Sequence, residues 1–423
     1  MTAIPPPRLG PRPLPLQLAM ALTVWLSSRA AWPLLRSGSL PWRLDRAEAA
    51  LDLQKSLAAL DAETFSAALD RELRGRAGRF LAGIELYRHH PYRRALADPP
   101  LVWQEGTTRL LDYAPHGGAP VLVVPSLINR AYILDLAPGK SLLRALAAAG
   151  LRPLLIDWGA PAALERSFDL TDYVAGRLEA AADAAAEVAG APLAVMGYCM
   201  GGLLALALAA RRPRLVRALA LLATPWSFHA ERAGQARMLG RFATPLALAC
   251  AGLGELPVDL LQALFLSVDP LVSVRKFTRF AELPQDSAAA RLFVALEDWL
   301  NDGVPLALPV ARECLGGWYG EDSAARGLWR IAGLPVRPAG VAAASLVVVP
   351  GQDRIVPPAG AAALGAALPT AQIVRPPLGH IGMIVGSGAE RAVWRPLARW
   401  LKRQLGAPGS QSARGGLSKR KQL

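Results

Sequence analysis

The stretch Met196-Gly197-Tyr198-Cys199-Met200-Gly201-Gly202 decides the fold, because it joins two apolar segments of different character. Residues 192–196 before it are typical of a buried strand, and residues 203–208 after it are typical of a buried helix. Glycines on both sides of Cys199 allow a tight turn in which larger side chains would collide with the strand and the helix. The pattern therefore predicts a strand, a sharp turn that presents Cys199, and a helix.

A strand, a Gly-x-nucleophile-x-Gly turn and a helix together form the nucleophile elbow of an α/β-hydrolase fold. The nucleophile in such a turn is usually serine, and here it is Cys199. The alternative interpretation is a glycine-rich turn with a buried structural cysteine, since a free cysteine often behaves as a small hydrophobic residue. Motifs elsewhere in the chain distinguish a catalytic cysteine from a structural one.

An acid and a base follow in the order that this fold requires. Asp353 comes in the turn after the apolar run 345–350, and His380 comes in a Gly-flanked loop after the run 371–374. The order nucleophile, acid, histidine is the one expected for an α/β-hydrolase. We therefore predict that Cys199, Asp353 and His380 are the catalytic residues.

Two backbone N–H groups are expected to form an oxyanion hole. One belongs to Met200, the residue after the nucleophile, and the other belongs to the loop after the apolar run 120–125. Leu127 and Ile128 are both candidates for this second donor, because a backbone donor leaves no signature in the sequence.

The order of apolar segments predicts an α/β class fold with a mostly parallel, doubly wound sheet. We assign residues 101–225 and 341–405 to the two parts of this core, residues 226–340 to a helical cap insertion, and residues 1–100 to an N-terminal extension with an apolar, basic arm followed by helices. Residues 406–423 have the composition of a disordered basic tail.

Polar residues in front of apolar periodic segments predict where helices begin. Asp61, Ser141 and Thr171 are each expected to cap a helix, and the last of these helices should end at Gly190. No apolar run reaches the roughly 18 residues that span a bilayer. The longest is 14–26, which we interpret as an apolar arm or an interfacial helix.

Composition excludes several functional classes. Three widely spaced cysteines form no disulfide framework, which fits a reducing cytoplasm. The formal net charge of +14 fits an Arg-rich composition or attraction of an anionic partner such as a coenzyme A ester. No nucleic-acid motif is present. His89 and His90 lack a third ligand at a suitable spacing, so we expect neither a metal nor a cofactor.

Several motifs, taken together, resemble those of the polyhydroxyalkanoate synthases, and most closely the short, two-component branch of that family. They cover roughly residues 83–405 and are Pro125-Ser126-Leu127-Ile128-Asn129-Arg130-Ala131-Tyr132, Ile156-Asp157-Trp158-Gly159, Asp169-Leu170-Thr171-Asp172-Tyr173, Gly197-Tyr198-Cys199-Met200-Gly201-Gly202, Gly351-Gln352-Asp353 and Gly379-His380-Ile381-Gly382. Arg354 stands where the family often has histidine, and the N-terminal region is longer than in the short branch and shorter than in the long one.

The resemblance implies an acyltransferase that polymerises 3-hydroxyacyl-CoA thioesters into polyester with release of CoA, through an acyl group bound to Cys199. It also implies a cytoplasmic protein that meets its growing polyester chain, with a granule surface, a second synthase subunit or a homodimer as further partners. Two alternatives remain from the sequence. One is a Cys-dependent hydrolase, either a polyester depolymerase or a thioesterase, and the other is a non-catalytic homologue that binds granules or a partner.

Overall fold

The computed structural model describes residues 7–406, which form two compact units. The first contains residues up to Arg93 and residues Gln262–Asn301, and the second contains Arg94–Leu261 and the residues from Asp302 on. The predicted cap, residues 226–340, is therefore divided between the two units. Most of the predicted basic tail, from residue 407 on, lies outside the described residues.

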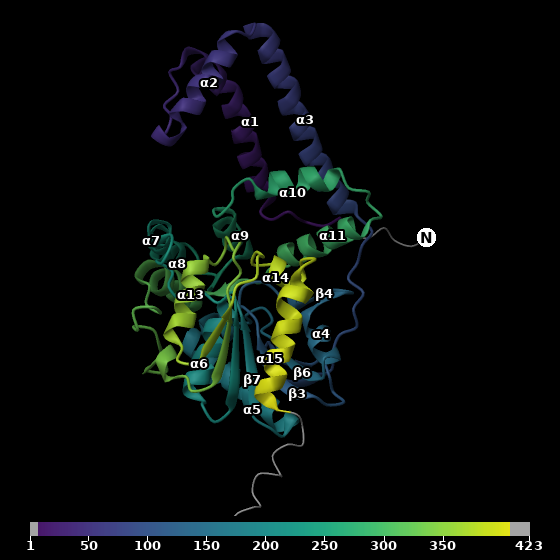
Figure 1. Cartoon of the computed structure of the whole chain (residues 1–423), viewed down its shortest axis with the longest axis vertical. Coiled ribbons are helices and arrows are strands. Elements are labelled where there is room, and N and C mark those ends of the chain that lie inside the picture. The colour runs from purple at the N-terminus through teal and green to yellow at the C-terminus, as the bar shows by residue number, and fades with distance from the viewer. Residues whose placement is uncertain (1–6, 407–423) are drawn as a thin grey trace, which may run out of the picture. The chain divides into compact units, whose positions relative to one another are not determined.

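The second unit is built on a mixed eight-stranded sheet (Figure 1). The six strands from β6 to the C-terminal edge pair parallel with their neighbours, whereas the pairs β1–β2 and β2–β6 are antiparallel. This confirms the predicted α/β, mostly parallel sheet. The strands, in spatial order, are β1 (Leu101–Glu105), β2 (Thr108–Asp112), β6 (Leu151–Asp157), β3 (Ala119–Val124), β7 (Leu193–Tyr198), β8 (Val216–Leu222), β13 (Ala344–Val348) and β14 (Ala371–Val374).

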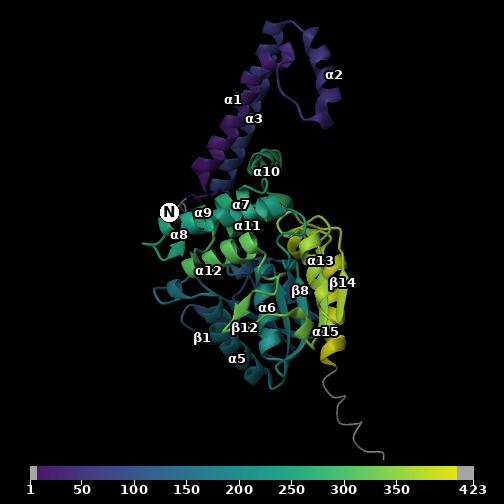
Figure 2. The same ribbon diagram turned by 90° about the vertical axis from the view of Figure 1, so that its left-hand side faces the viewer.

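Helices cover both faces of this sheet, which explains why its central strands are continuous apolar runs. Helix α6 packs on β7 and β8 from one face, and α15 packs on the same two strands from the other (Figure 2). The helices of this layer are α4 (Leu142–Ala148), η4 (Asp172–Leu178, a π-helix) continued by α5 (Glu179–Ala189), α6 (Met200–Arg211), α13 (Pro358–Ala367), α14 (Gly382–Val385), and η7 (Glu390–Trp394, a π-helix) continued by α15 (Arg395–Leu405).

The insertion between β8 and β13 is helical, as predicted. In the second unit it contains η5, a π-helix whose residues include Tyr319. The helices of the insertion are α7 (Ala233–Arg241), α8 (Ala243–Ala249), α9 (Val258–Leu266), α10 (Val272–Ala281), α11 (Ala288–Asn301), α12 (Leu308–Arg312) and η5 (Glu313–Gly320). Short two-stranded ladders, β9 (Glu255–Leu256) with β10 (Leu306–Ala307) and β11 (Arg330–Ile331) with β12 (Leu334–Pro335), complete it.

The first unit joins the N-terminal helices to α10 and α11 through an aromatic core. The ring of Phe277 packs against Phe80 and Tyr87 at centroid distances of 6.4 and 5.7 Å. A Cβ on Gly83 would lie 2.0 Å from the carbonyl oxygen of Phe277, so only glycine allows α3 and α10 to approach this closely. The N-terminal helices are α1 (Leu14–Ser37), α2 (Ala47–Ala58) and α3 (Ala62–His89).

The prediction for the N-terminal arm was wrong about its length. Helix α1 has 24 residues, and its length and composition would allow it to cross a membrane, as they would for a signal sequence or a core helix. Pro15 lies in the first turn, where a missing N–H costs nothing, and buried Gln17 donates a side-chain hydrogen bond to the Arg12 carbonyl at 2.8 Å. Neither residue therefore interrupts the helix.

The helix caps follow the prediction at two of three positions. Asp61 accepts a hydrogen bond from the Thr64 N–H at 2.8 Å, and Ser141 accepts one from the Arg144 N–H at 3.0 Å. Thr171 is no cap, because it already lies within the helix and Asp169 accepts from the Asp172 N–H at 3.0 Å instead. This helix ends at Gly190, with a φ of 63°.

A buried carboxylate fixes the start of the second unit. Asp135 is fully buried and receives hydrogen bonds from the guanidinium groups of Arg94 and Arg144 and from the hydroxyl of Tyr113. The two arginines remain partly exposed. Since a buried carboxylate is tolerated only when its oxygens are satisfied, this cluster ties the segment that follows Arg93 to the body of the second unit.

Candidate active site

Cys199 lies on the turn between β7 and α6 in a backbone conformation that few residues adopt. Its φ is 55° and its ψ is −129°, and its N–H donates to the Leu222 carbonyl oxygen of the neighbouring strand β8 at 2.9 Å. Its thiol is only partly buried, unlike those of Cys250 and Cys314. Strained backbone of this kind is maintained by its surroundings and concentrates at functional sites. The structure thus presents the thiol at the carboxyl edge of the sheet.

The glycines around Cys199 are required by close backbone contacts. A Cβ on Gly197 would lie 2.4 Å from the Gly202 Cα, and a Cβ on Gly201 would lie 2.2 Å from the Val124 carbonyl oxygen. A Cβ on Gly202 would lie 1.8 Å from the hydroxyl of Thr224. Each distance is too short for any side chain, so the pattern read from the sequence has a direct steric cause.

The structure brings Asp353 and His380 together beside this thiol. His380 Nδ1 lies 2.7 Å from Asp353 Oδ2, and because a carboxylate only accepts, Nδ1 carries the proton. The other carboxylate oxygen, Oδ1, accepts from the N–H groups of Ile355 and Val356 at 2.8 and 2.9 Å. Both side chains are buried. The three hydrogen bonds hold the carboxylate of Asp353 in one orientation.

The electrostatics of His380 connect it to Cys199. Burial by itself lowers the pKa of His380, but the charge of a Cys199 thiolate, the hydrogen bonds to Asp353 and Cys199, and the charge of Asp353 together raise that pKa to about 10. The imidazolium form is thus favoured when the thiol has lost its proton.

Two aromatic residues that the sequence analysis did not single out support this arrangement. Tyr198, directly before Cys199, donates from its hydroxyl to the His380 carbonyl oxygen at 3.2 Å. Trp158 donates from Nε1 to the Pro125 carbonyl oxygen at 3.0 Å, which fixes the loop after β3. Their positions next to the motifs were visible in the sequence, but the contacts join segments that are distant along the chain.

The two candidates for the second oxyanion donor are not equivalent. The Ile128 N–H donates to the hydroxyl of Ser126 at 3.0 Å. The Leu127 N–H makes no hydrogen bond within the part of the chain that the structure describes, and Leu127 is buried. Met200 is the first residue of α6, so its N–H has no acceptor within the helix. The available donors are therefore those of Met200 and Leu127.

His89 is exposed and contacts Glu85 on its own helix, whereas His90 makes packing contacts. His90 is buried, its Nε2 lies 2.8 Å from the Gln285 carbonyl oxygen, and its Nδ1 accepts from the Tyr92 N–H. Between residues 7 and 406, no group of three or more His, Cys, Asp or Glu side chains is arranged to hold a metal ion.

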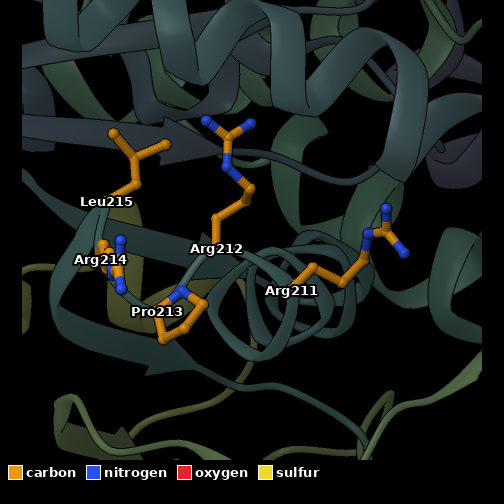
Figure 3. A pocket seen from close by; sticks show the side chains of 5 residues that line it. All are labelled: Arg211, Arg212, Pro213, Arg214 and Leu215. Atoms are coloured by element: carbon orange, nitrogen blue, oxygen red, sulfur yellow. The ribbon is translucent and has the colours of Figure 1, made fainter.

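A cavity of about 490 Å³ lies at the opposite edge of the sheet from Cys199, beside the start of β8. Figure 3 shows its lining residues, which are Arg211, Arg212, Pro213, Arg214 and Leu215. Arg211 and Arg212 are already paired with Glu179, and Arg212 also pairs with Asp183. The two arginines therefore have charge partners, and the cavity has no connection with the thiol site.

Comparisons with known proteins agree with this geometry. Residues 120–387 match the family described as alpha/beta hydrolase fold. A protein from Synechocystis sp. named poly(3-hydroxyalkanoate) polymerase subunit PhaC is 32% identical over 295 residues, which cover 67% of this chain and 77% of that protein. A protein of the same name from Haloferax mediterranei is 29% identical over 310 residues, which cover 71% of this chain and 63% of the relative.

Among solved structures, an alpha/beta hydrolase fold protein from Nakamurella multipartita is 19% identical, with a TM-score of 0.43, and the match covers 73% of this chain and 100% of that one.

Proposed function

Because the chain belongs to the α/β-hydrolase fold family and, within it, to the poly(3-hydroxyalkanoate) polymerases, we propose that it polymerises 3-hydroxyacyl-CoA thioesters into polyester with release of CoA. The observation that carries this proposal is the thiol of Cys199 on the elbow, coupled to the hydrogen-bonded pair His380–Asp353. A thiol suits this substrate, because transfer from one thioester to another is nearly balanced in energy and a thiolate is both a strong nucleophile and a good leaving group.

In the loading step, His380 Nε2 takes the proton of the Cys199 thiol, and the thiolate attacks the carbonyl carbon of the substrate thioester. Asp353 keeps the proton on Nδ1, so that Nε2 is the free acceptor, and stabilises the imidazolium that forms. When the tetrahedral intermediate collapses, the bond to the CoA sulfur breaks. CoA leaves with the proton from His380, and Cys199 retains the acyl group.

The negative oxygen of the tetrahedral intermediate would be held by the N–H groups of Met200 and Leu127. Both donors point from fixed backbone, one at the start of α6 and one in the loop that Trp158 anchors. Preorganised donors of this kind stabilise the transition state because they need no reorientation during the reaction. The N–H of Ile128 already donates to the Ser126 hydroxyl, which favours Leu127 as the second donor.

In the elongation step, the 3-hydroxyl of a second acyl unit attacks the thioester on Cys199. His380 accepts the hydroxyl proton and returns it to the sulfur as the new ester bond forms. Water would release the chain by hydrolysis at the same step, so the residues of the helical insertion in the second unit would have to keep water from the thioester. None of these steps requires a metal or a cofactor.

The surface of the chain fits the proposed substrate and product. The formal net charge of +14 favours the collection of CoA phosphates. Helix α1 exposes a strip of apolar side chains, including Leu22 at 53% and Leu26 at 60%, which would rest on the polyester surface in the cytoplasm. Replacing both leucines by glutamate should reduce co-sedimentation with polyester particles, and unchanged co-sedimentation would refute this role.

A second polypeptide is part of the proposal, because the relatives are named as subunits of a polymerase. We propose that this chain, too, works with a partner subunit or as a homodimer. Polymerisation by the purified chain as a monomer, at a rate that added subunits do not change, would contradict the need for a second polypeptide.

The experiment that tests the function is the release of CoA from 3-hydroxybutyryl-CoA by the purified chain, with the product sized at the end of the reaction. Long polyester is the expected product. Release of CoA with only free hydroxy acid would instead identify a thioesterase. Cys199→Ala should abolish the release of CoA, while Cys250→Ala, which changes a buried thiol outside the site, should retain it.

A further inference from the structure

Tyr319 is a phenol that the mechanism above does not use, and it belongs to a well-fixed part of the helical insertion. It lies in η5, a π-helix turn of the kind that is frequent at functional sites. Its side chain is half-buried, and its hydroxyl makes no hydrogen bond to any of the residues that the structure describes. A half-buried phenol without a protein partner is available for a ligand.

The loop after β8 holds Tyr319 from two sides. His229 Nε2 lies 2.7 Å from the Tyr319 carbonyl oxygen, and the ring of Phe228 meets the Tyr319 ring edge to face at 4.8 Å. Asp322, which follows η5, binds the same loop: its carboxylate accepts from the Ser227 hydroxyl at 3.0 Å and from the Phe228 N–H at 2.8 Å. The position of Tyr319 is thus determined by the same loop that follows β8.

This loop begins beside Cys199. Strands β7 and β8 are parallel neighbours, and the Cys199 N–H donates to the Leu222 carbonyl oxygen at the end of β8. On the other side of η5, a Cβ on Gly240 would lie 2.3 Å from the Gly320 Cα, so α7 and η5 pack backbone against backbone. The segment that carries the phenol therefore packs on two elements: on α7, and on the loop that leaves β8 next to the nucleophile turn.

The electrostatics of the phenol agree with this position. Burial raises the pKa of Tyr319, and the charges that Cys199 and Cys314 would carry raise it further. The hydroxyl therefore keeps its proton at neutral pH. In this form it can donate a hydrogen bond, and it cannot serve as a base.

From this placement we propose that Tyr319 is a specificity residue: its hydroxyl donates a hydrogen bond to the 3-hydroxyl oxygen of the acyl unit that is loaded onto Cys199. The carbonyl oxygen of the thioester already has the N–H groups of Met200 and Leu127, so the phenol serves an oxygen that only a 3-hydroxyacyl group carries. This inference rests on the proposed function and deepens it, because it assigns the recognition of the 3-hydroxyl to one residue.

A comparison of two substrates tests this assignment. Butyryl-CoA lacks the 3-hydroxyl but has the same thioester, and it can load Cys199 without being elongated. Single-turnover release of CoA is measured by rapid quenching with 3-hydroxybutyryl-CoA and with butyryl-CoA, for the wild-type chain and for Tyr319→Phe. A single neutral hydrogen bond corresponds to about a 3- to 10-fold change in rate. Tyr319→Phe should therefore load 3-hydroxybutyryl-CoA about 3- to 10-fold more slowly and butyryl-CoA at an unchanged rate.

Tyr113→Phe is the matched control, because it also removes one phenolic hydroxyl, which donates to buried Asp135 at 3.3 Å away from the thiol site. It should leave the ratio of the two loading rates unchanged. If Tyr319→Phe slows both substrates equally, or neither, the proposed hydrogen bond to the 3-hydroxyl does not exist. If the wild-type chain loads neither substrate, the proposed function fails and this inference fails with it.

Discussion

Replacement of Asp353 by asparagine tests how the site controls the proton on His380. The carboxylate accepts three hydrogen bonds, two from backbone N–H groups on Oδ1 and one from His380 Nδ1 on Oδ2. In Asp353→Asn the amide oxygen can keep the two backbone donors, and the amide NH₂ then faces Nδ1. The NH₂ group donates, so Nδ1 becomes the acceptor and the proton moves to Nε2, where it blocks the acceptance of the thiol proton.

The expected loss follows from this change of tautomer. In a catalytic triad an acid-to-amide change of this kind lowers the turnover rate by roughly 10³- to 10⁴-fold, which corresponds to about 4 to 5.5 kcal/mol in the activation free energy. The fold should persist, because the buried backbone N–H groups keep their acceptor. The assay is the release of CoA from 3-hydroxybutyryl-CoA, with the thermal unfolding midpoint measured in parallel.

Asp183→Asn is the control for this experiment, since Asp183 is an exposed partner of Arg212 and should leave the rate unchanged. A variant Asp353→Asn that is folded and retains more than a tenth of the wild-type rate would refute the assignment of Asp353. A loss of activity that is accompanied by unfolding would refute the argument that the backbone donors stay satisfied.

Four further substitutions and one pH titration have outcomes that the structure predicts. Asp135→Asn should lower the free energy of unfolding by about 2 to 3 kcal/mol in urea titrations, because it leaves buried donors and two partly exposed arginines without their carboxylate; an unchanged midpoint would contradict the role of this cluster. Gly201→Ala should give no active, folded protein, whereas Gly176→Ala, where a Cβ would meet nothing within 4 Å, should stabilise the fold by about 0.5 to 1 kcal/mol in the same titration. His380 should remain protonated at pH 8 in NMR titrations, since its pKa is raised from 6.5 to about 10; the stability gained from this charge is present below pH 6.5 and is lost as the pH rises through about 10. Cys199→Ala removes a charge that raises the pKa of His380, so this substitution should lower that pKa. An unchanged pKa would show that the two side chains do not interact.

The parts of the fold that could be predicted from the sequence are those with local causes. The strand, turn and helix around Cys199 follow from apolar runs and from glycines whose Cβ positions are occupied by backbone or by Thr224. The order of Cys199, Asp353 and His380 was sufficient to predict that their side chains meet, because each follows a parallel strand of one sheet and such strands end at the same edge.

The predictions that failed depended on finer contacts or on distant ones. Asp169 and Thr171 are both suitable helix caps by residue type. The reciprocal hydrogen bonds between Asp169 and Asp172 show that Asp169 is the cap. The division of the predicted cap depends on apolar contacts of Phe277 with the N-terminal helices, some 190 residues away along the chain. Periodicity within a segment carries no information about such a partner.

The residues that the sequence analysis missed have the same explanation. Ser126 accepts the Ile128 N–H through a side-chain contact two residues away, which a Ser-x-x turn pattern would have indicated. Tyr198 and Tyr319 had no distinguishing pattern, since their relevance arises from contacts with loops far away along the chain. Tyr198 contacts the loop of His380, and Tyr319 contacts the loop after β8.

The measurement that tests the central claim most directly is mass spectrometry of the chain quenched in acid during turnover of 3-hydroxybutyryl-CoA. The account predicts a hydroxybutyryl group, or a short oligomer of it, on the peptide that contains Cys199, and no such group in Cys199→Ala. Polymer formation without an acyl group on Cys199, or an acyl group on Cys250 or Cys314 instead, would contradict the assignment of Cys199 as the residue that carries the growing chain.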